Sequence, residues 1–267
     1  MLNVSSHNPI SDNLAAPVEE NTSRQSPAAE ITPGKTYCRD RAAKLLLERY
    51  AAGEREFRNL RLIGADLPGI QLCHADLREA NLSRANLEDA DLTGIDLAGA
   101  KLVEANLVQS QLSKAELGEA FLIGTQMAAS VCSDADFRKA NLGQANLTNA
   151  SLQGALLQES RLISSDLSGA NLQGADLQNS YLIETNFDRA NLQSAQLQGA
   201  VMQGASLRNS DLTNADLTGA ILMDADLRGA NLTDANLDGS VLDGAQHDEQ
   251  TVFPLDFNLQ SIGAAIG

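Results

Sequence analysis

A large apolar residue recurs every five residues through most of the chain. Between Leu62 and Leu242 the repeat covers 37 positions, of which 32 are Leu, and Phe57 adds one unit before them. A small residue stands two positions earlier: from Ala65 to Ser240, 25 of 36 such positions are Ala and nine are Ser or Thr. The residue directly before the Leu is often Asp or Asn, and no insertion interrupts the pattern.

A period of five residues fits neither an α-helix, which repeats every 3.6 residues, nor a β-strand, which alternates every two. It predicts a coil with short straight sides, each of which turns a corner after five residues. The Leu and the small residue point inward and the other three residues point outward. Stacked coils would lie about 4.8 Å apart and would satisfy each other's backbone hydrogen bonds.

Large apolar residues beside the repeated Leu positions indicate how many sides each coil has. There are fourteen of them, and folding the sequence at 20 residues per coil places eleven on one side, whereas folding at 15 collects seven at most. The 38 units therefore predict four sides and about 9.5 coils. The eleven, here called the apolar stripe, are Ile63, Val103, Phe121, Ile123, Ile163, Tyr181, Ile183, Val201, Ile221, Met223 and Val241. The remaining three are Val108, Val131 and Leu156.

The motif Ala-(Asp/Asn)-Leu-x-x over residues 55–245 resembles the pentapeptide-repeat family. Members of that family form a right-handed quadrilateral β-helix, so the resemblance implies an all-β solenoid of this class. The segment before the first coil resembles the amino-terminal cap of cyanobacterial pentapeptide-repeat proteins, including one that promotes heterocyst differentiation. This second, shorter resemblance implies a cyanobacterial source.

The two ends of the chain depart from the repeat. Residues 1–36 are rich in Ser, Asn, Pro and Glu, and we expect a disordered tail there because they bury too little apolar surface. Residues 37–54 predict a capping α-helix over the first coil, ended by Gly53. One face of that helix would carry Ala43, Leu46, Leu47 and Tyr50.

Residues 246–267 predict a carboxyl-terminal cap and tail. Four large apolar residues follow the last repeated Leu, and a proline stands among them. We expect them to plug the final coil rather than to form another side. They are Val252, Phe253, Leu255 and Phe257.

The charge balance restricts the classes of partner that the chain is expected to bind. The chain has 19 basic and 35 acidic residues, giving a net charge of −16. A nucleic-acid backbone and an anionic membrane surface both repel such a chain, so neither is an expected partner. The sequence has no basic start followed by an apolar run and no stretch of 18 apolar residues, so we expect a cytoplasmic protein.

No candidate for catalysis emerges from the repeat. Asp residues before the Leu recur because the repeat recurs, and an uninterrupted rod is expected to offer no deep pocket for them to serve. The three cysteines form no Cys-x-x-Cys pair; Cys132 takes an inward position, and Cys73 points outward. We therefore expect no enzyme, cofactor, metal ion or small-molecule substrate.

Two function classes remain. The apolar stripe, interrupted by Arg61, Lys101 and Arg161, favours a regulator or module that binds a protein partner. Homodimerisation through the same stripe is a further possibility, and strand propensity alone also explains Ile and Val on one side. The alternative is a DNA mimic, since some family members protect topoisomerases by occupying the DNA site of gyrase. The acidic charge fits that reading, whereas the unbroken repeat and the scarcity of central Phe do not.

Overall fold

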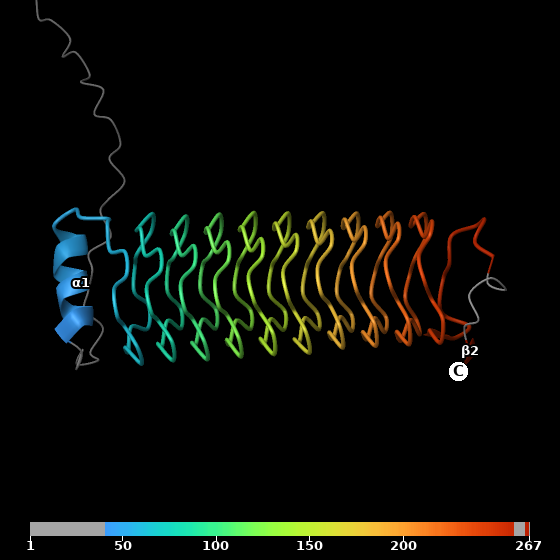
Figure 1. Ribbon diagram of the computed structural model, residues 1–267, viewed down its shortest axis with the longest axis horizontal. Coiled ribbons are helices and arrows are strands. Elements are labelled where there is room, and N and C mark those ends of the chain that lie inside the picture. The colour runs from blue at the N-terminus through green and yellow to red at the C-terminus, as the bar shows by residue number, and fades with distance from the viewer. Residues whose placement is uncertain (1–40, 259–264, 267) are drawn as a thin grey trace, which may run out of the picture. The chain divides into compact units, whose positions relative to one another are not determined.

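A four-sided β-helix forms most of the computed structural model, which describes residues 41–258 and 265–266 (Figure 1). Its regular elements are α1 (Arg41–Ala51), β1 (Gln246–His247) and β2 (Ala265–Ile266). Between α1 and β1, isolated parallel β-bridges join each coil to the next, always between residues 20 apart. Twenty residues are four repeat units, so each coil has the four sides predicted.

The sides are numbered here in chain order by the residue that precedes the inward Leu. Side 1 holds Arg61 and every twentieth residue after it, and sides 2, 3 and 4 are defined in the same way from Asp66, Gln71 and Asp76. Residues directly after the inward Leu belong to the same side, because both flank the same short strand. Each side is therefore a narrow parallel ladder that runs along the rod.

Every repeat unit ends in a tight turn. In the first full unit the Ala65 N–H donates to the Leu62 carbonyl at 3.1 Å, and Gly64 between them has a φ of 63°. This hydrogen bond and the positive φ at the third residue are typical of a type II turn. Non-glycine residues adopt the same φ in many units, for example Glu159 at 58° and Asn149 at 57°.

The turns leave the remaining backbone groups pointing along the rod. Leu62 N–H donates to the Asn81 carbonyl at 2.7 Å, and Asn81 N–H donates back to the Leu60 carbonyl at 2.8 Å. The same exchange repeats from coil to coil. Since buried backbone groups need partners, this pairing lets a chain of five-residue sides stay folded without long strands.

The interior is a column of Leu closed at the corners by small residues. Leu147 is fully buried, and so are the five residues that replace Leu in the repeat. Polar corner residues cost little, because their hydroxyls bond locally: Ser160 Oγ donates to the Leu157 carbonyl at 2.6 Å. The five replacements are Met127, Cys132, Phe137, Phe187 and Met202.

The Asp and Asn residues before the Leu have a structural use. Their side-chain oxygens accept the backbone N–H two residues later, as when Gln178 N–H donates to Asp176 Oδ1 at 3.1 Å. On side 2 they also bond from coil to coil, with Asn86 Nδ2 donating to Asp66 Oδ1 at 2.9 Å and Asn106 Nδ2 to Asn86 Oδ1 at 3.0 Å. These bonds explain why Asp and Asn are preferred directly before the inward Leu, without a catalytic or ligand-binding role.

The amino-terminal helix lies within the segment predicted for it, of which residues 37–40 are outside the described part of the chain. Of residues 37–54, α1 occupies Arg41–Ala51, and Gly53 follows with a φ of 94°. Its Ala43 and Leu46 are buried in the same cluster as the first inward residues of the β-helix. The predicted tail, residues 1–36, lies outside the described residues.

The carboxyl-terminal end continues the ladder beyond the expected boundary at residue 245. Gln246 pairs with Asp226 at the usual separation, and Val252 pairs with Asn231, a separation of 21 residues. One extra residue is thus accommodated after β1, which also pairs in parallel with β2. Val252 therefore forms one more rung, contrary to the expectation that it belongs only to a plug. Phe253 and Phe257 stack with their ring centroids 5.3 Å apart and pack partly buried against the core.

Side 2 carries an ion-pair network near its carboxyl-terminal end, in which a buried carboxylate bonds to two exposed arginines. Asp226 is 8% exposed and accepts hydrogen bonds from Arg228 Nη2 at 2.6 Å, from Arg228 Nε at 2.9 Å, and from Arg208 Nε. The hydrogen bonds from Arg228, followed by those from Arg208, outweigh the effect of burial and hold the pKa of Asp226 well below its usual range. Asp226 is therefore a carboxylate that stabilises the fold while it is ionised.

Truncating an inward Leu is expected to be severe. Leu147→Ala should lower the free energy of unfolding by roughly 2–5 kcal/mol, because it opens a cavity in mid-rod. Leu147→Asp should cost more, since it also buries a charge. Chemical denaturation followed by circular dichroism measures both. The control is the exposed Gln173→Ala, expected to stay within about 0.5 kcal/mol of wild type; equal effects for the Leu and Gln variants would contradict a close-packed interior.

Removing the charge of Asp226 should lower stability in a pH-dependent way. Because the folded-state pKa is depressed, the stabilisation is fully present above the unfolded-state pKa of about 3.9 and is lost as the pH falls through the folded-state value. Asp226→Asn should therefore be less stable than wild type by roughly 1–2 kcal/mol at pH 7. The difference in unfolding free energy between the variant and wild type should narrow steadily below about pH 4 in denaturation curves. A gap that stays constant down to pH 2 would show that the carboxylate charge is not what stabilises the site.

Candidate functional site

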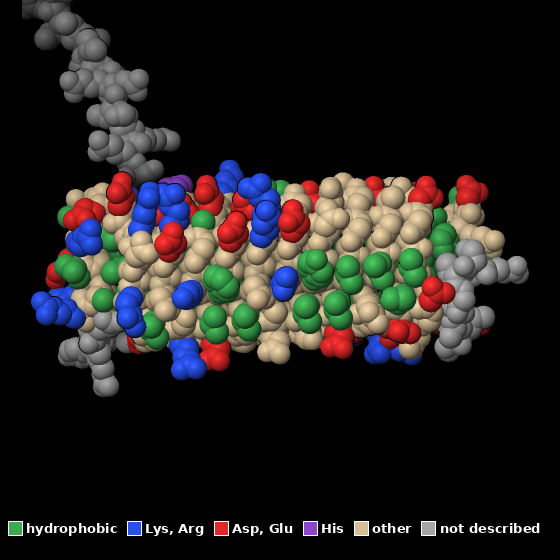
Figure 2. Space-filling view, viewed as in Figure 1, with side chains coloured by type: hydrophobic (Ala, Val, Ile, Leu, Met, Phe, Trp, Pro, Cys, Tyr) green, Lys and Arg blue, Asp and Glu red, His purple; other side chains and the backbone are tan. Residues whose placement is uncertain are grey.

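The structure brings the eleven residues of the apolar stripe together on side 1. One row precedes the inward Leu and forms a single β-bridge ladder, in which Tyr181, Val201, Ile221 and Val241 follow one another. The second row follows the Leu and is held by backbone bonds such as Glu104 N–H to the Ile123 carbonyl at 2.9 Å. Figure 2 shows the two rows as parallel lines of hydrophobic side chains along the rod.

Six members of the apolar stripe are exposed, and the other five are half-buried by their neighbours. The most open are Ile63 at 46%, Phe121 at 45% and Tyr181 at 42% of their full accessible surface. Within residues 55–245, every large hydrophobic side chain that is exposed belongs to this stripe. The three apolar residues that the sequence placed elsewhere are half-buried on other sides. Side 1 therefore concentrates the apolar surface of the β-helix.

Three cations lie in the first of these rows, directly before the inward Leu. Arg61, Lys101 and Arg161 are exposed, and within the described part of the chain none of them forms an ion pair. The Arg161 guanidinium lies 5.5 Å from the ring centroid of Tyr181, which is a cation–π distance. Side 1 thus presents positive charge beside aromatic and aliphatic surface.

Side 4 has the opposite character. The positions before the inward Leu are mostly acidic, and the arginines two residues further on pair with them. Arg58 lies 2.6 Å from Asp76, and Arg78 lies 2.7 Å from the same carboxylate. Arg138 bonds to Asp136 at 2.5 Å. The acidic row is therefore partly neutralised where these arginines occur.

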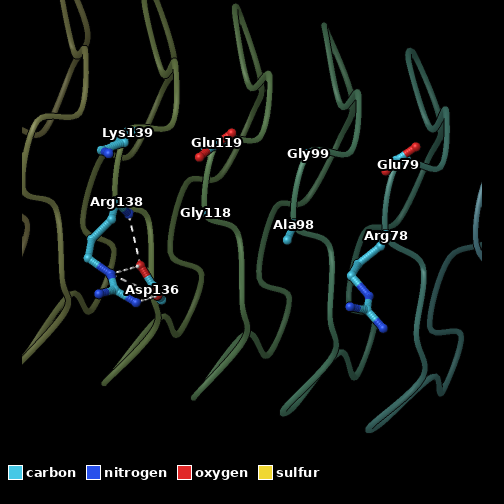
Figure 3. A pocket seen from close by; sticks show the side chains of 9 residues that line it. All are labelled: Arg78, Glu79, Ala98, Gly99, Gly118, Glu119, Asp136, Arg138 and Lys139. Atoms are coloured by element: carbon cyan, nitrogen blue, oxygen red, sulfur yellow. Dashed lines mark hydrogen bonds and ion pairs between the residues drawn. The ribbon is translucent and has the colours of Figure 1, made fainter.

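Shallow hollows line the edge between sides 4 and 1. One of about 490 Å³ lies over Ala98 and Gly118, with Arg78 and Arg138 at its two ends (Figure 3). Both arginines already bond to carboxylates of side 4, so neither is free to hold an anion there.

Two further hollows lie along the same edge and reach onto side 1. One, of about 480 Å³, includes Phe121, Asn141 and Arg161, and the other, of about 510 Å³, includes Arg161 and Tyr181. Lys139 lines all three hollows. Sequence reasoning missed them, although two small residues at a spacing of 20, Ala98 and Gly118, were a signal for the first.

The remaining candidates for chemistry are the cysteine thiols and clusters of possible metal ligands. Burial raises the pKa of the Cys132 thiol to about 12, and burial together with a hydrogen bond to Asp91 raises that of Cys73 to about 11, so neither is a ready thiolate. Over the described residues, no group of three or more His, Cys, Asp or Glu side chains is placed to hold a metal ion. Nor, across residues 41–258 and 265–266, is any helix long and apolar enough to cross a membrane.

Comparison with protein families identifies the repeat. A family model described as pentapeptide repeats matches this chain in 8 copies. Comparison with curated protein sequences gives no match. The residues matched by the family model are 56–94, 90–127, 130–169, 165–204, 190–229 and 220–246.

Several solved structures are similar to this chain. HetL, a pentapeptide repeat protein involved in heterocyst differentiation regulation from the cyanobacterium Nostoc sp. strain PCC 7120, is 35% identical; the match covers 75% of this chain and 94% of HetL, with a TM-score of 0.47. A trypsin-treated form of QnrB1, a plasmid-mediated fluoroquinolone resistance protein, is 20% identical over 68% of this chain and 91% of its own, with a TM-score of 0.48. The pentapeptide repeat protein alr5209 from Nostoc PCC 7120 is 33% identical over 46% of this chain and 84% of its own, with a TM-score of 0.34.

The repeats and the coils lead to the same conclusion. Pentapeptide repeats build a right-handed quadrilateral β-helix, and the 20-residue ladders described above have that four-sided form. The family model covers well over half of the 267 residues. The chain belongs to the pentapeptide-repeat family.

Proposed function

We propose that this protein is a non-catalytic interaction module or regulator that binds a protein partner through the apolar stripe. The observation that carries the proposal is the concentration of exposed apolar side chains on side 1, while the other sides are covered by polar groups. Exposed apolar side chains gathered on one face of a soluble protein mark interaction sites more often than scattered ones do. Aromatic Phe121 and Tyr181 suit a contact surface, because aromatic side chains are enriched at interfaces.

The absence of enzymatic activity belongs to the same proposal. Within the described residues many Asp and Asn side chains before the inward Leu are engaged in turns and ladders, and the hollow over Ala98 and Gly118 is shallow, with its two arginines already paired to carboxylates. A catalytic site needs a pocket with convergent free polar groups. We propose on the same grounds that the protein takes no cofactor, metal ion or small-molecule substrate, and that it acts in the cytoplasm, in a cyanobacterium.

The helix α1 is proposed to cap the first of about 9.5 coils. Leu46 is 1% exposed, and the Tyr50 hydroxyl donates to the Cys73 carbonyl at 3.1 Å. The Arg49 guanidinium lies 5.1 Å from the ring centroid of Phe57, the first inward residue. Covering this end protects a coil that has no neighbour on one side.

A DNA mimic that acts on a topoisomerase such as gyrase is the second candidate. The acidic row of side 4 favours it, since carboxylates there repeat from coil to coil as phosphates repeat along a strand. The arginines described above weaken that likeness. The carboxylates of this row are Glu56, Asp76, Asp96, Glu116, Asp136, Asp176 and Asp216.

Charges placed in the apolar stripe should abolish partner binding without loss of fold. The double variant Ile123→Asp, Ile183→Asp should lose proteins that wild type retains from a lysate of the source cell, because a partner would have to bury the new carboxylates. Circular dichroism and melting should match wild type, since both residues point outward. The matched control is Val131→Asp, Leu156→Asp, which adds the same charges on sides 3 and 4 and should bind as wild type does.

We expect a direct assay of gyrase to contradict the DNA-mimic candidate. At micromolar concentration the protein should leave DNA supercoiling by gyrase unchanged, because paired arginines interrupt the acidic row. Clear inhibition that excess DNA relieves would reverse the order of the two candidates.

A further inference from the structure

The geometry points to the class of partner: an amphipathic α-helix that lies lengthwise on side 1 and places carboxylates opposite Arg61, Lys101 and Arg161. This inference rests on the proposed function and adds the chemistry and the shape of the occupant. It depends on the charge of side 1, on the acids along its edges, on the state of its backbone and on the spacing of its cations.

The charge of side 1 is opposite to that of the chain. The row from Arg61 to Val241 contains three cations and no Asp or Glu, and the row that starts at Ile63 has no charged residue before Asp243 at its carboxyl-terminal end, although the protein carries a net charge of −16. On other sides the cations mostly have partners, such as Arg78 with Asp76 at 2.7 Å on side 4. Cations left unpaired within an apolar surface call for carboxylates from outside.

A second copy of this chain does not supply those carboxylates. If two rods met parallel through side 1, Lys101 would face the row of Val103. If they met antiparallel, each cation would face an apolar residue, an Asn or another cation of its own row, and never a carboxylate of that row. Burying an unpaired cation is costly, so the surface is poorly suited to pairing with itself.

Acidic residues along both edges limit the width of the occupant. Those on the edge toward side 4 and those on the edge toward side 2 are all exposed. A flat anionic membrane would press against both edges at once and be repelled. A narrow element seated between them reaches the cations and avoids the acids. The acidic edge residues are Glu79, Glu119, Glu159, Glu104, Glu184 and Asp224, two of which are paired with cations of the same edges, Glu104 with Arg84 and Glu159 with Lys139.

The backbone of side 1 decides between a helix and a strand. Its N–H and C=O groups already bond to the coils before and after, as Phe121 N–H does with the Ala100 carbonyl at 2.9 Å. A peptide strand laid along this side would find no backbone partners, so strand addition is excluded here. An α-helix satisfies its own backbone and can dock through side chains alone.

The spacing of the cations fits one face of a helix. Arg61 and Lys101 are two coils apart, about 10 Å, and Lys101 and Arg161 are three coils apart, about 14 Å. With a rise of about 1.5 Å per residue, carboxylates at i, i+7 and i+18 lie on one face and span about 27 Å, close to the roughly 24 Å from Arg61 to Arg161. The reverse direction gives i, i+11 and i+18. Apolar residues between them would meet the two rows of the stripe.

Selection from a displayed library of random 24-residue peptides tests this inference with the full chain as bait. Wild type should enrich peptides that carry Asp or Glu at spacings of about 7 and 11 residues on an apolar helical face. The charge-reversed variant Lys101→Glu, Arg161→Glu should bind a synthetic copy of the selected peptide at least about tenfold more weakly, and wild-type binding should weaken with salt. In a parallel selection the variant should favour Lys or Arg at the same places. Glu is tolerated before the inward Leu, as Glu116 shows, so the fold should be kept.

The matched control is Lys114→Glu, Arg189→Glu, which changes the net charge equally away from side 1 and should bind the peptide as wild type does. Equal binding by wild type and Lys101→Glu, Arg161→Glu would overturn the inference. If Ile123→Asp, Ile183→Asp still lost binding in that case, the apolar stripe would stand as a binding surface and only the acidic helix would fail. Two other results would also overturn it: binding to vesicles of equal parts phosphatidylcholine and phosphatidylserine that the charge reversal abolishes, or a dimer in sedimentation that Ile123→Asp, Ile183→Asp dissociates.

Discussion

The backbone hydrogen bonding between successive coils, which pairs residues 20 apart in β-bridges, is the constraint on which the rest of this structure depends. A five-residue side is too short to be a stable strand by itself, and it gains its partners only from the coils on either side. This pairing fixes which residue lies above which along the whole β-helix. The inward Leu column, the corner residues and the rows on each side all follow from it.

The interior and the exterior therefore obey different rules. Inside, Leu and Ala repeat almost without variation, because each coil must match the coil that it covers. Outside, each side varies freely as long as the turn can form, so neighbouring sides differ in chemistry. Side 1 is apolar and basic, side 4 is acidic with paired arginines, and side 2 carries a ladder of amides. One backbone pattern thus holds several distinct surfaces.

Much of this arrangement could be predicted from the sequence, since the repeat sets the register directly. The fold at 20 residues per coil followed from Ile63, Tyr181 and similar residues, and the ladders have that spacing. The end of the ladder at Val252 could not be predicted, because the extra residue there breaks the repeat while the pairing continues. The arginine contacts of Asp226 depend on where long side chains come to rest, which a period does not specify. The hollow over Ala98 and Gly118 arises where outward side chains are small, and the repeat does not specify the size of outward residues.

The five-residue unit also shapes how such a protein can change its length. Loss or gain of one unit keeps Leu stacked on Leu, yet it turns every later residue by a quarter of a revolution about the rod. Such an event in the middle of the chain would leave the core intact and send Tyr181, Val201 and Ile221 to a different side from Phe121. Only steps of 20 residues preserve the alignment. A lineage can therefore rebuild its surface by slippage of fifteen nucleotides, and one that depends on a long binding surface has to evolve by whole revolutions.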